Sequence, residues 1–268
     1  MDLQLRDRVY LVTGASRGLG LAGARVLAAE GARLVLSSRD PVAAAAAAAS
    51  LGTGGRGAPG LAAGAPGSAR RAVAIAADNA DPAAAGLLTD GARQAFGRLD
   101  GALISVGGPP AGAVQDITDA VWRSAFETVF LGAVRLAVAV AAQLTAGGSI
   151  VFVLSTSVRA PLAGLAVSNG LRPGLAGVAK TMADELGPRG IRVNGLLPGR
   201  FDTDRVRELD AASGDPAAAA AQLTARVPLR RYGDPAEFGR VAAFILSPAA
   251  SFVTGAMIPV DGGSLRAL

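Results

Sequence analysis

The stretch "TGASRGLG", residues 13–20, lies between a short apolar run and a longer one with helical spacing. The run before it, residues 8–13, favours a β-strand, and the run after it, residues 19–30, favours a helix that Gly31 ends. Glycines in such a turn let the backbone approach a pyrophosphate, and the first N–H groups of the helix face it. The stretch therefore predicts a strand, turn and helix that together bind a dinucleotide.

The same alternation of strand and helix continues along the chain. The predicted strands are 8–13, 33–37, 72–76, 99–106, 149–154, 191–197 and 256–260, and the predicted helices are 19–30, 41–51, 82–96, 118–144, one ending near 187, and 235–246. Strands that alternate with helices imply right-handed crossovers and a parallel sheet covered on both faces. We therefore expect an α/β fold, a single Rossmann-like doubly wound domain over residues 1–268.

Composition limits the chemistry that this chain can perform. The 268 residues are 51% hydrophobic and 18% charged, which suits a globular core, and they include neither Cys nor His. Disulfides, thiolate nucleophiles and cysteine or histidine metal sites are excluded, as is the commonest general base. Catalysis must use hydroxyls, carboxylates, arginine or a cofactor, and we expect no metal.

The basic charge does not point to nucleic acid. The net charge is +5, but the arginines are scattered, with adjacent pairs only at 70–71 and 230–231. Charged residues occupy the N-terminus where a secretory signal would be apolar, and apolar runs such as 136–142 are too short to span a bilayer. We expect a soluble cytoplasmic protein with neither nucleic acid nor a membrane as partner.

Two segments depart from the alternation. Residues 51–69 consist mostly of Gly, Ala and Pro and are predicted to be a flexible insertion. Residues 209–228 contain helix formers but few bulky side chains, which suggests a mobile substrate lid of short helices. Small apolar residues in "GGPPAGAV", 107–114, suggest that the lid covers an apolar pocket.

The end of the second predicted strand indicates which cofactor is bound. It reads "LSSR", residues 36–39, without the acidic residue that holds the ribose 2′-hydroxyl of NAD. Ser38 and Arg39 suit a 2′-phosphate, and Arg17 adds a second cation; the alternative for Arg39 is a solvated loop charge. Asp40 precedes Pro41 and is interpreted as a helix N-cap. NADP(H) is therefore predicted over NAD(H).

At this point the chain resembles the short-chain dehydrogenase/reductase family. The motifs that carry the resemblance are "TGASRGLG", Asp78, "GGSIVFVLS" leading to Ser155, "RGIRVNGLLPG" at 189–199, "DTD" at 202–204 and "FVTGAMIPVDGG" at 252–263. It implies a seven-stranded sheet in the order 3-2-1-4-5-6-7, with Asp78 and Asn79 beside the adenine and Gly107 near the ribose. With the resemblance, the full set of predicted cofactor-binding residues is Gly14, Ser16, Arg17, Gly18, Leu19, Gly20, Ser38, Arg39, Asp78, Asn79, Gly107, Arg172, Pro198, Gly199, Phe201 and Thr203, the last four around the nicotinamide.

The catalytic tetrad of the family, Asn, Ser, Tyr and Lys, is not retained. Ser155 matches the family Ser, but counting back from "IRVN" puts Ser168 at the Tyr position and Arg172 at the Lys position. Val129 stands at the Asn position. The chain is most similar to a subgroup related to β-ketoacyl-acyl-carrier-protein reductases, with "GGPP" after the fourth strand and a Ser-Asn…Arg segment.

A shifted alignment does not restore the usual pair. The two tyrosines are Tyr10 and Tyr232 and the one lysine is Lys180, so no YxxxK occurs in the chain. A Ser hydroxyl is a far weaker acid than a phenol, and Arg172 can stabilise negative charge but will not shuttle protons as Lys can.

Three functions are compatible with this site. The first is an NADP(H)-dependent oxidoreductase that acts on a carbonyl or alcohol of an apolar, acyl- or polyketide-like substrate, small or acyl-carrier-bound. Its catalytic residues would be Ser155, Ser168 and Arg172, with water or Ser168 completing proton transfer. The second is a catalytically degenerate NADP(H)-binding sensor or structural subunit. The third is another reaction, such as reduction of an activated alkene or a dehydration.

Pro173 leaves the local structure open. Either a helix begins at Pro173, with 168–172 as an irregular turn, or a helix begins at Ser168 with a strained first turn. In the first case Ser168 is a cap or turn residue.

Two predicted helices, 118–144 and the one after 173, are apolar around much of their circumference. A helix that is apolar on more than one face needs a packing partner on each, which predicts a homodimer or homotetramer.

Overall fold

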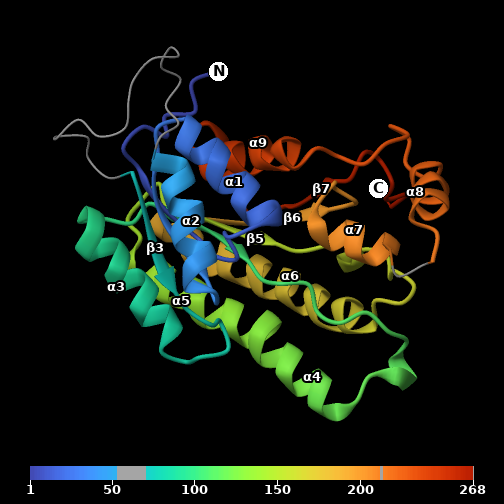
Figure 1. The fold of residues 1–268 in the computed structure, drawn as a ribbon. Helices are drawn as coiled ribbons and strands as arrows, with labels where there is room; N and C mark the ends of the chain where they lie inside the picture. Colours follow the sequence, from blue (N-terminus) through green and yellow to red (C-terminus); the bar gives the residue numbers. More distant parts are fainter. Residues whose placement is uncertain (53–70, 212–213, 268) are drawn as a thin grey trace.

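The computed structural model describes residues 1–52, 71–211 and 214–267. Seven parallel strands form one sheet in the order β3-β2-β1-β4-β5-β6-β7, as predicted (Figure 1). The strands are β1 (Val9–Val12), β2 (Arg33–Ser38), β3 (Ala72–Ala76), β4 (Gly101–Ser105), β5 (Ser149–Val153), β6 (Arg192–Pro198) and β7 (Met257–Val260). The order reverses between β1 and β4, and such switch points form the binding crevice of doubly wound sheets.

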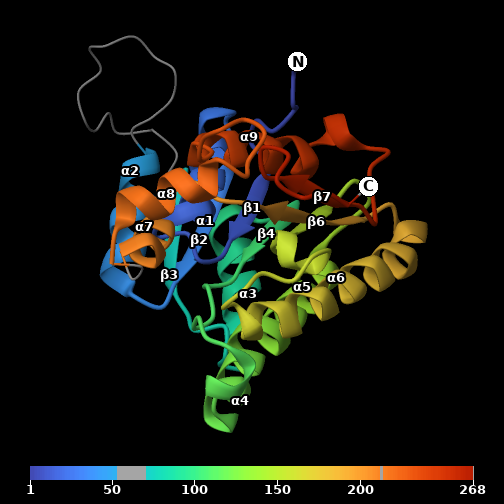
Figure 2. The same ribbon diagram turned by 90° about the vertical axis from the view of Figure 1, so that its right-hand side faces the viewer.

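Helices cover both faces of the sheet, as Figures 1 and 2 show from two directions. One layer contains α1 (Gly18–Ala29), α2 (Pro41–Gly52) and α9 (Pro235–Leu246), and the other contains α3 (Ala84–Phe96), α4 (Asp119–Ala125), α5 (Gly132–Gln143) and α6 (Ala166–Leu186). Within the layers α1 packs on α9 and α3 on α5. The expected three-layer architecture is confirmed.

Each central strand contributes to two cores because its side chains alternate between the faces. On β1, Leu11 packs in the core beneath α3, α5 and α6, whereas Tyr10 and Val12 pack in the core beneath α1 and α9. On β5, Phe152 and Val151 divide in the same way. Burial on both faces explains why these strands read as continuous apolar runs.

The predicted long helix 118–144 is continuous but not uniform. Thr118 caps α4, and a π-helical turn, η2 (Phe126–Leu131), joins α4 to α5. By length and composition the helical segment Asp119–Gln143 could cross a membrane. In this fold it instead forms part of the layer over the sheet, where α5 packs against α3 and β4.

The chain around the predicted lid forms two short helices, α7 (Asp204–Ala211) and α8 (Pro216–Thr224). They lie to the right of the strands in Figure 1. Asp210 anchors α7, because it accepts hydrogen bonds from Arg200 at 2.6 Å and from the Tyr232 hydroxyl at 2.8 Å. The lid role of residues 209–228 stays a prediction. The predicted insertion, residues 51–69, lies outside the described residues from 53 onward.

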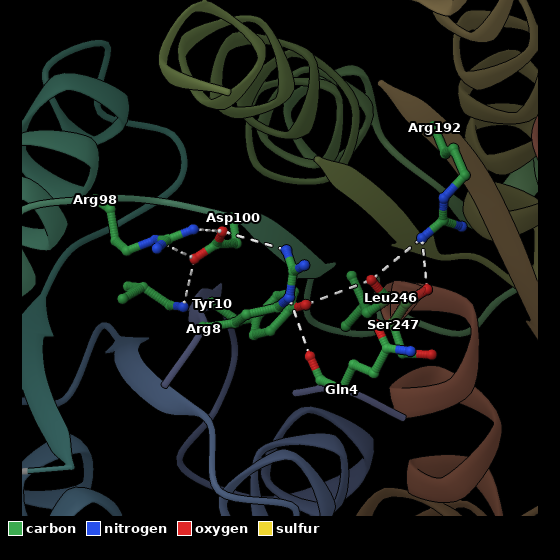
Figure 3. A network of polar contacts seen from close by, with 9 residues as sticks. Gln4, Arg8, Tyr10, Arg98, Asp100, Arg192, Leu246 and Ser247 are labelled. Carbon is green, nitrogen blue, oxygen red and sulfur yellow. Dashed lines mark hydrogen bonds and ion pairs between the residues drawn. The ribbon is translucent and has the colours of Figure 1, made fainter. Parts of the chain in front are cut away.

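The amino ends of the strands are closed by a polar network (Figure 3). Asp100, just before β4, accepts the backbone N–H of Val9 at 2.8 Å and pairs with Arg98 at 2.6 Å and Arg8 at 3.5 Å. Arg192 donates to the carbonyl oxygens of Ile245, Leu246 and Ser247 at the end of α9 and to that of Val253. This end of the sheet is stabilised by contacts within the protein.

Candidate active site

The carboxyl ends of the strands open into a cleft of about 890 Å³. Every residue predicted to bind the cofactor or to take part in catalysis lines it, from the glycine turn at Gly14 to Thr203 after β6. Ser155, Ser168 and Arg172 line the same cleft, and so does Val129 from η2. The structure thus brings together residues that are up to 189 positions apart in the sequence, counted from Gly14 to Thr203.

The glycine turn is shaped for close backbone contact. Gly14 has a φ of +57°, and a Cβ on it would lie 2.8 Å from the carbonyl oxygen of Ser105. A Cβ on Gly20 would lie 2.4 Å from the carbonyl oxygen of Gly14, so only glycine fits there. No side chain caps the first turn of α1, where Arg17 is the N-cap residue. These first N–H groups and the cleft together fit a pyrophosphate.

The cations predicted for the 2′-phosphate lie at the outer part of the cleft. Arg39 is exposed at the end of β2, and the Ser38 hydroxyl donates to Ser16 Oγ at 3.1 Å. Asp40 caps α2, because its carboxylate accepts from the N–H groups of Val42 and Ala43 at 2.9 and 3.1 Å, as predicted.

Arg17 has a partner that the sequence did not predict. Its guanidinium pairs with Glu208 of α7 at 3.2 Å, across the mouth of the cleft. Arg205, also on α7, donates to the carbonyl oxygen of Pro109 at 3.1 Å. Both contacts link α7 to loops on the opposite side of the cleft, and an anion bound at Arg17 would compete with Glu208.

Pro173 does not begin the helix. α6 runs without interruption from Ala166 to Leu186 and contains Pro173, so the interpretation of Ser168 as a cap or turn residue is wrong. The alternative, a helix that includes Ser168 and continues through Pro173, is confirmed, although it begins two residues earlier than predicted, at Ala166. Pro173 leaves the carbonyl of Asn169 without its usual helical donor, but packing of this face on the sheet holds the turn helical. Because they are four apart on one helix, Ser168 and Arg172 share a face, and both are buried.

The Ser168 hydroxyl has an unexpected partner. Its Oγ lies 3.2 Å from Ser157 Oγ, and either atom can be the donor. Ser155 Oγ instead accepts the N–H of Ser157 at 3.1 Å and caps the short 3-10 turn after β5. Since that bond uses only a lone pair, the Ser155 proton remains available to a ligand. Ser157 is missing from the sequence prediction, because only the fold brings the turn after β5 against α6.

Arg172 is the most deeply buried charge beside the cleft, with 7% of its surface exposed. Nη1 donates to the carbonyl oxygens of Val153 and Leu154 at 2.8 and 3.0 Å. Burial lowers the pKa of the guanidinium to about 10, so it remains charged at neutral pH. The structure thus anchors Arg172 to the end of β5 within the cleft, and its electrostatic role stays a prediction.

Asn169, the second residue of the Ser-Asn…Arg segment, joins α6 to the loop that precedes it. Its side-chain amide donates to the carbonyl oxygen of Leu162 at 2.8 Å and accepts from the N–H of Leu162 at 3.0 Å. The adjoining Leu165 forms a bridge with Gly112 from the loop after β4.

Comparisons with known proteins agree with this architecture. The family described as Enoyl-(Acyl carrier protein) reductase matches residues 14–264. The 3-oxoacyl-[acyl-carrier-protein] reductase of Escherichia coli is 30% identical over 97% of this chain and 98% of that protein. Cis-4-hydroxycyclohexanecarboxylate dehydrogenase of Sinomonas cyclohexanicum is 31% identical over 96% of both chains. The structure of L-sorbose reductase from Gluconobacter frateurii, complexed with NADPH and L-sorbose, is similar with a TM-score of 0.90 at 27% identity over 100% of both chains.

Proposed function

The chain belongs to the short-chain dehydrogenase/reductase family of oxidoreductases, and from this we propose that it transfers hydride between NADP(H) and a carbonyl or alcohol of an apolar substrate, in the cytoplasm. Ser155, Ser168 and Arg172 would act in place of the usual tetrad. The observation that carries the proposal is that the glycine turn, two cations and these three residues line one cleft.

The glycine turn, Arg17 and Arg39 support NADP(H) as the cofactor. The turn can receive a pyrophosphate, and the second strand ends without an acidic residue that would favour NAD(H). One structural neighbour was solved with NADPH. When bound, the reduced cofactor supplies the hydride, and the protein supplies orientation and charge.

The chain's own residues would handle the substrate oxygen. The Ser155 hydroxyl would donate a hydrogen bond to the substrate oxygen, and the positive charge of Arg172 would stabilise the negative charge that develops on that oxygen. The proton needed by that oxygen would come from water or from the Ser168 hydroxyl, with Ser157 as the next hydroxyl in line. Arg172 could also donate to the nicotinamide ribose.

Apolar side chains around these groups support an apolar substrate. The cleft wall near Arg172 includes Val106, Val129 and Leu165. The relative from Sinomonas cyclohexanicum is named for a hydroxycyclohexanecarboxylate, a carbon ring with a hydroxyl and a carboxylate, and the relative from Escherichia coli for a 3-oxoacyl group on an acyl carrier protein. Either a small molecule or an acyl-carrier-bound chain suits the cleft.

A second candidate is an NADP(H)-binding sensor or structural subunit without turnover. The lack of a strong proton donor in the cleft favours it. Among the described residues that line the cleft there is no Tyr or Lys, and the Ser168 hydroxyl is already bonded to Ser157. A site of this kind could bind cofactor and lack an efficient acid.

One experiment separates the two candidates. NADPH and NADH are titrated into the protein, and bound NADPH is then monitored by its absorbance over a panel of apolar ketones. We expect NADPH to bind more tightly than NADH and to be oxidised by some ketones. Tight NADPH binding without oxidation would favour the sensor, and equal affinity for both cofactors would contradict the NADP assignment.

The double variant Ser168→Tyr, Arg172→Lys is the matched comparison for the reaction. If the native site is active by the proposed route, the native protein oxidises NADPH with ketones of the panel although it lacks the Tyr and Lys that the double variant introduces. Activity only in the double variant would show that the native chain is not a carbonyl reductase.

We also propose a homodimer or homotetramer. Phe126 and Val138 on the outer side of the η2 and α5 segment are 42% and 58% exposed, and Phe126 stacks on Phe130 at 5.2 Å. Apolar side chains left in water on a helical layer favour contact with another copy. Sedimentation at micromolar concentration tests this, and a monodisperse monomer would contradict it.

A further inference from the structure

Ser157 contacts both of the hydroxyls that the proposed function assigns to the substrate oxygen. It lies in η3 (Thr156–Val158), the 3-10 turn after β5. Its backbone N–H donates to Ser155 Oγ at 3.1 Å, and its side-chain Oγ lies 3.2 Å from Ser168 Oγ on α6. Ser157 is 2% exposed and is not among the described residues that line the cleft, whereas Ser155 and Ser168 are. One buried residue outside the cleft therefore contacts two hydroxyls of the cleft.

The bond from Ser157 to Ser155 has a fixed direction. A backbone N–H can only donate, so the Ser155 oxygen is the acceptor and its own proton takes no part in the bond. No residue in the described part of the chain accepts that proton. Because Ser155 lines the cleft, its proton is available to a ligand there.

The bond between Ser157 and Ser168 can run either way by its distance alone. If Ser168 donated, the Ser157 proton would have no acceptor among the described residues and, at 2% exposure, little access to water. A buried donor without a partner costs free energy. If Ser157 donates, its proton is paired, and the Ser168 proton is left for water or a ligand in the cleft. Only this second direction leaves no buried hydroxyl proton unpaired.

We propose that Ser157 is a positioning residue that makes both Ser155 and Ser168 hydrogen-bond donors toward the cleft. A hydroxyl oxygen that accepts a hydrogen bond donates its own proton more strongly. Two such donors favour a ligand atom that only accepts, as a ketone oxygen does. The inference rests on the proposed function for the identity of that atom, the substrate oxygen, but the direction of the two bonds does not depend on turnover.

Neutron diffraction tests the direction of the bonds, because it locates the deuterium on exchanged hydroxyls. The crystals contain the native protein with NADP⁺, the oxidised cofactor, so that the result is independent of turnover. We expect the deuterium on Ser157 Oγ to point at Ser168 Oγ, and those on Ser155 and Ser168 to point into the cleft. A Ser168 deuterium that points at Ser157 would overturn the proposal.

Ligand binding tests whether this direction matters to the substrate oxygen. The probes are para-fluoroacetophenone and para-fluoro-α-methylstyrene, which have nearly the same shape, but only the ketone has an oxygen that accepts hydrogen bonds. Fluorine NMR measures their affinities for the protein saturated with NADP⁺. We expect Ser157→Ala to lower the ketone-to-alkene affinity ratio about three-fold. Ser157→Thr keeps the hydroxyl and should preserve the ratio.

Two further variants separate positioning from a general structural effect. In a Ser168→Ala background, Ser157→Ala should leave the ratio unchanged, because Ser157 acts through Ser168. Ser149→Ala removes a buried hydroxyl at the other end of β5, and as the control it should leave the native ratio unchanged. A Ser157→Ala effect that persists without Ser168, or no effect with Ser168 present, would refute the positioning role. A native protein that does not bind the ketone would contradict the proposed function, and the deuterium positions would still decide the role of Ser157.

Discussion

Two buried arginines at opposite ends of the sheet differ in how many of their donors the protein uses. At the amino end, both Nη atoms of Arg192 donate to backbone carbonyls, four in all, at 2.7 to 3.3 Å; Figure 3 labels two of these partners, Leu246 and Ser247. At the carboxyl end, Arg172 uses Nη1 alone, for two carbonyls. Both are 7% exposed, so burial does not separate them. What separates them is that Arg192 uses both Nη atoms to complete the end of α9, whereas Arg172 uses only Nη1.

The largest expected effect tests the structural end. Arg192→Met should lower the free energy of unfolding by about 3 to 5 kcal/mol, because several buried carbonyls at the end of α9 lose a charged donor. Arg172→Met should cost less, about 2 kcal/mol, since two carbonyls are affected. Urea unfolding measures both. Arg189→Met is the control, because exposed Arg189 also donates to two carbonyls. If the two variants lose equal free energy of unfolding, the structural roles of Arg192 and Arg172 do not differ as proposed.

The next effect tests whether the cleft end is built for a cofactor. Gly20→Ala should weaken NADPH binding about 100-fold, about 2.7 kcal/mol, because its Cβ would force α1 away from Gly14. Fluorescence titration measures the affinity. Gly86→Ala, in α3 with open space around the added Cβ, is the control and should leave NADPH affinity unchanged. A Gly20→Ala protein that binds NADPH normally would contradict the proposal that the glycine turn binds the cofactor.

A smaller effect separates the two cofactors. Arg39→Leu should weaken NADPH binding about ten-fold and leave NADH unchanged, because only NADPH has a 2′-phosphate for the guanidinium. Arg25→Leu removes an exposed arginine of α1 that does not line the cleft and serves as the control. Parallel titrations with both cofactors check the prediction. Equal losses for NADPH and NADH would mean that Arg39 is a solvated loop charge.

The smallest effect concerns the contact between α7 and the glycine turn. Glu208→Gln should raise NADPH affinity about two-fold at low salt, because Arg17 no longer pairs with a carboxylate and both partners are exposed. The gain should shrink as salt rises. Glu127→Gln breaks the comparable Arg135 pair away from Arg17 and should change nothing. Weaker NADPH binding in Glu208→Gln would show that Glu208 contributes to the site instead of competing with it.

The sequence predicted the fold almost completely, because each strand and helix carries its own local signal. The predicted strand at 33–37 is β2, Arg33–Ser38, and the predicted helix 41–51 is α2, with Asp40 as its cap. The error lies at Pro173, where local preference indicated a boundary at or near the proline. Packing of Ser168 and Arg172 against the sheet outweighs the hydrogen bond that the proline removes.

The candidate site was predictable by position but not by partner. Spacing from "IRVN" identified Ser168 and Arg172, and both line the cleft. The bonds that define their chemistry join distant segments: Ser168 to Ser157 across 11 residues, and Arg172 to Val153 across 19. Sequence spacing on one helix cannot show which loop will meet that helix.

By itself, the amino-acid sequence determined the parallel α/β fold, the glycine turn between β1 and α1 and the absence of the usual Tyr and Lys, since these depend on local periodicity and residue identity. Only the tertiary structure decided that Arg17 pairs with Glu208, that Ser168 meets Ser157, and that Arg192 uses both Nη atoms while Arg172 uses one. The physical reason is that a donor's remaining capacity depends on which carbonyls and carboxylates the folded chain places around it.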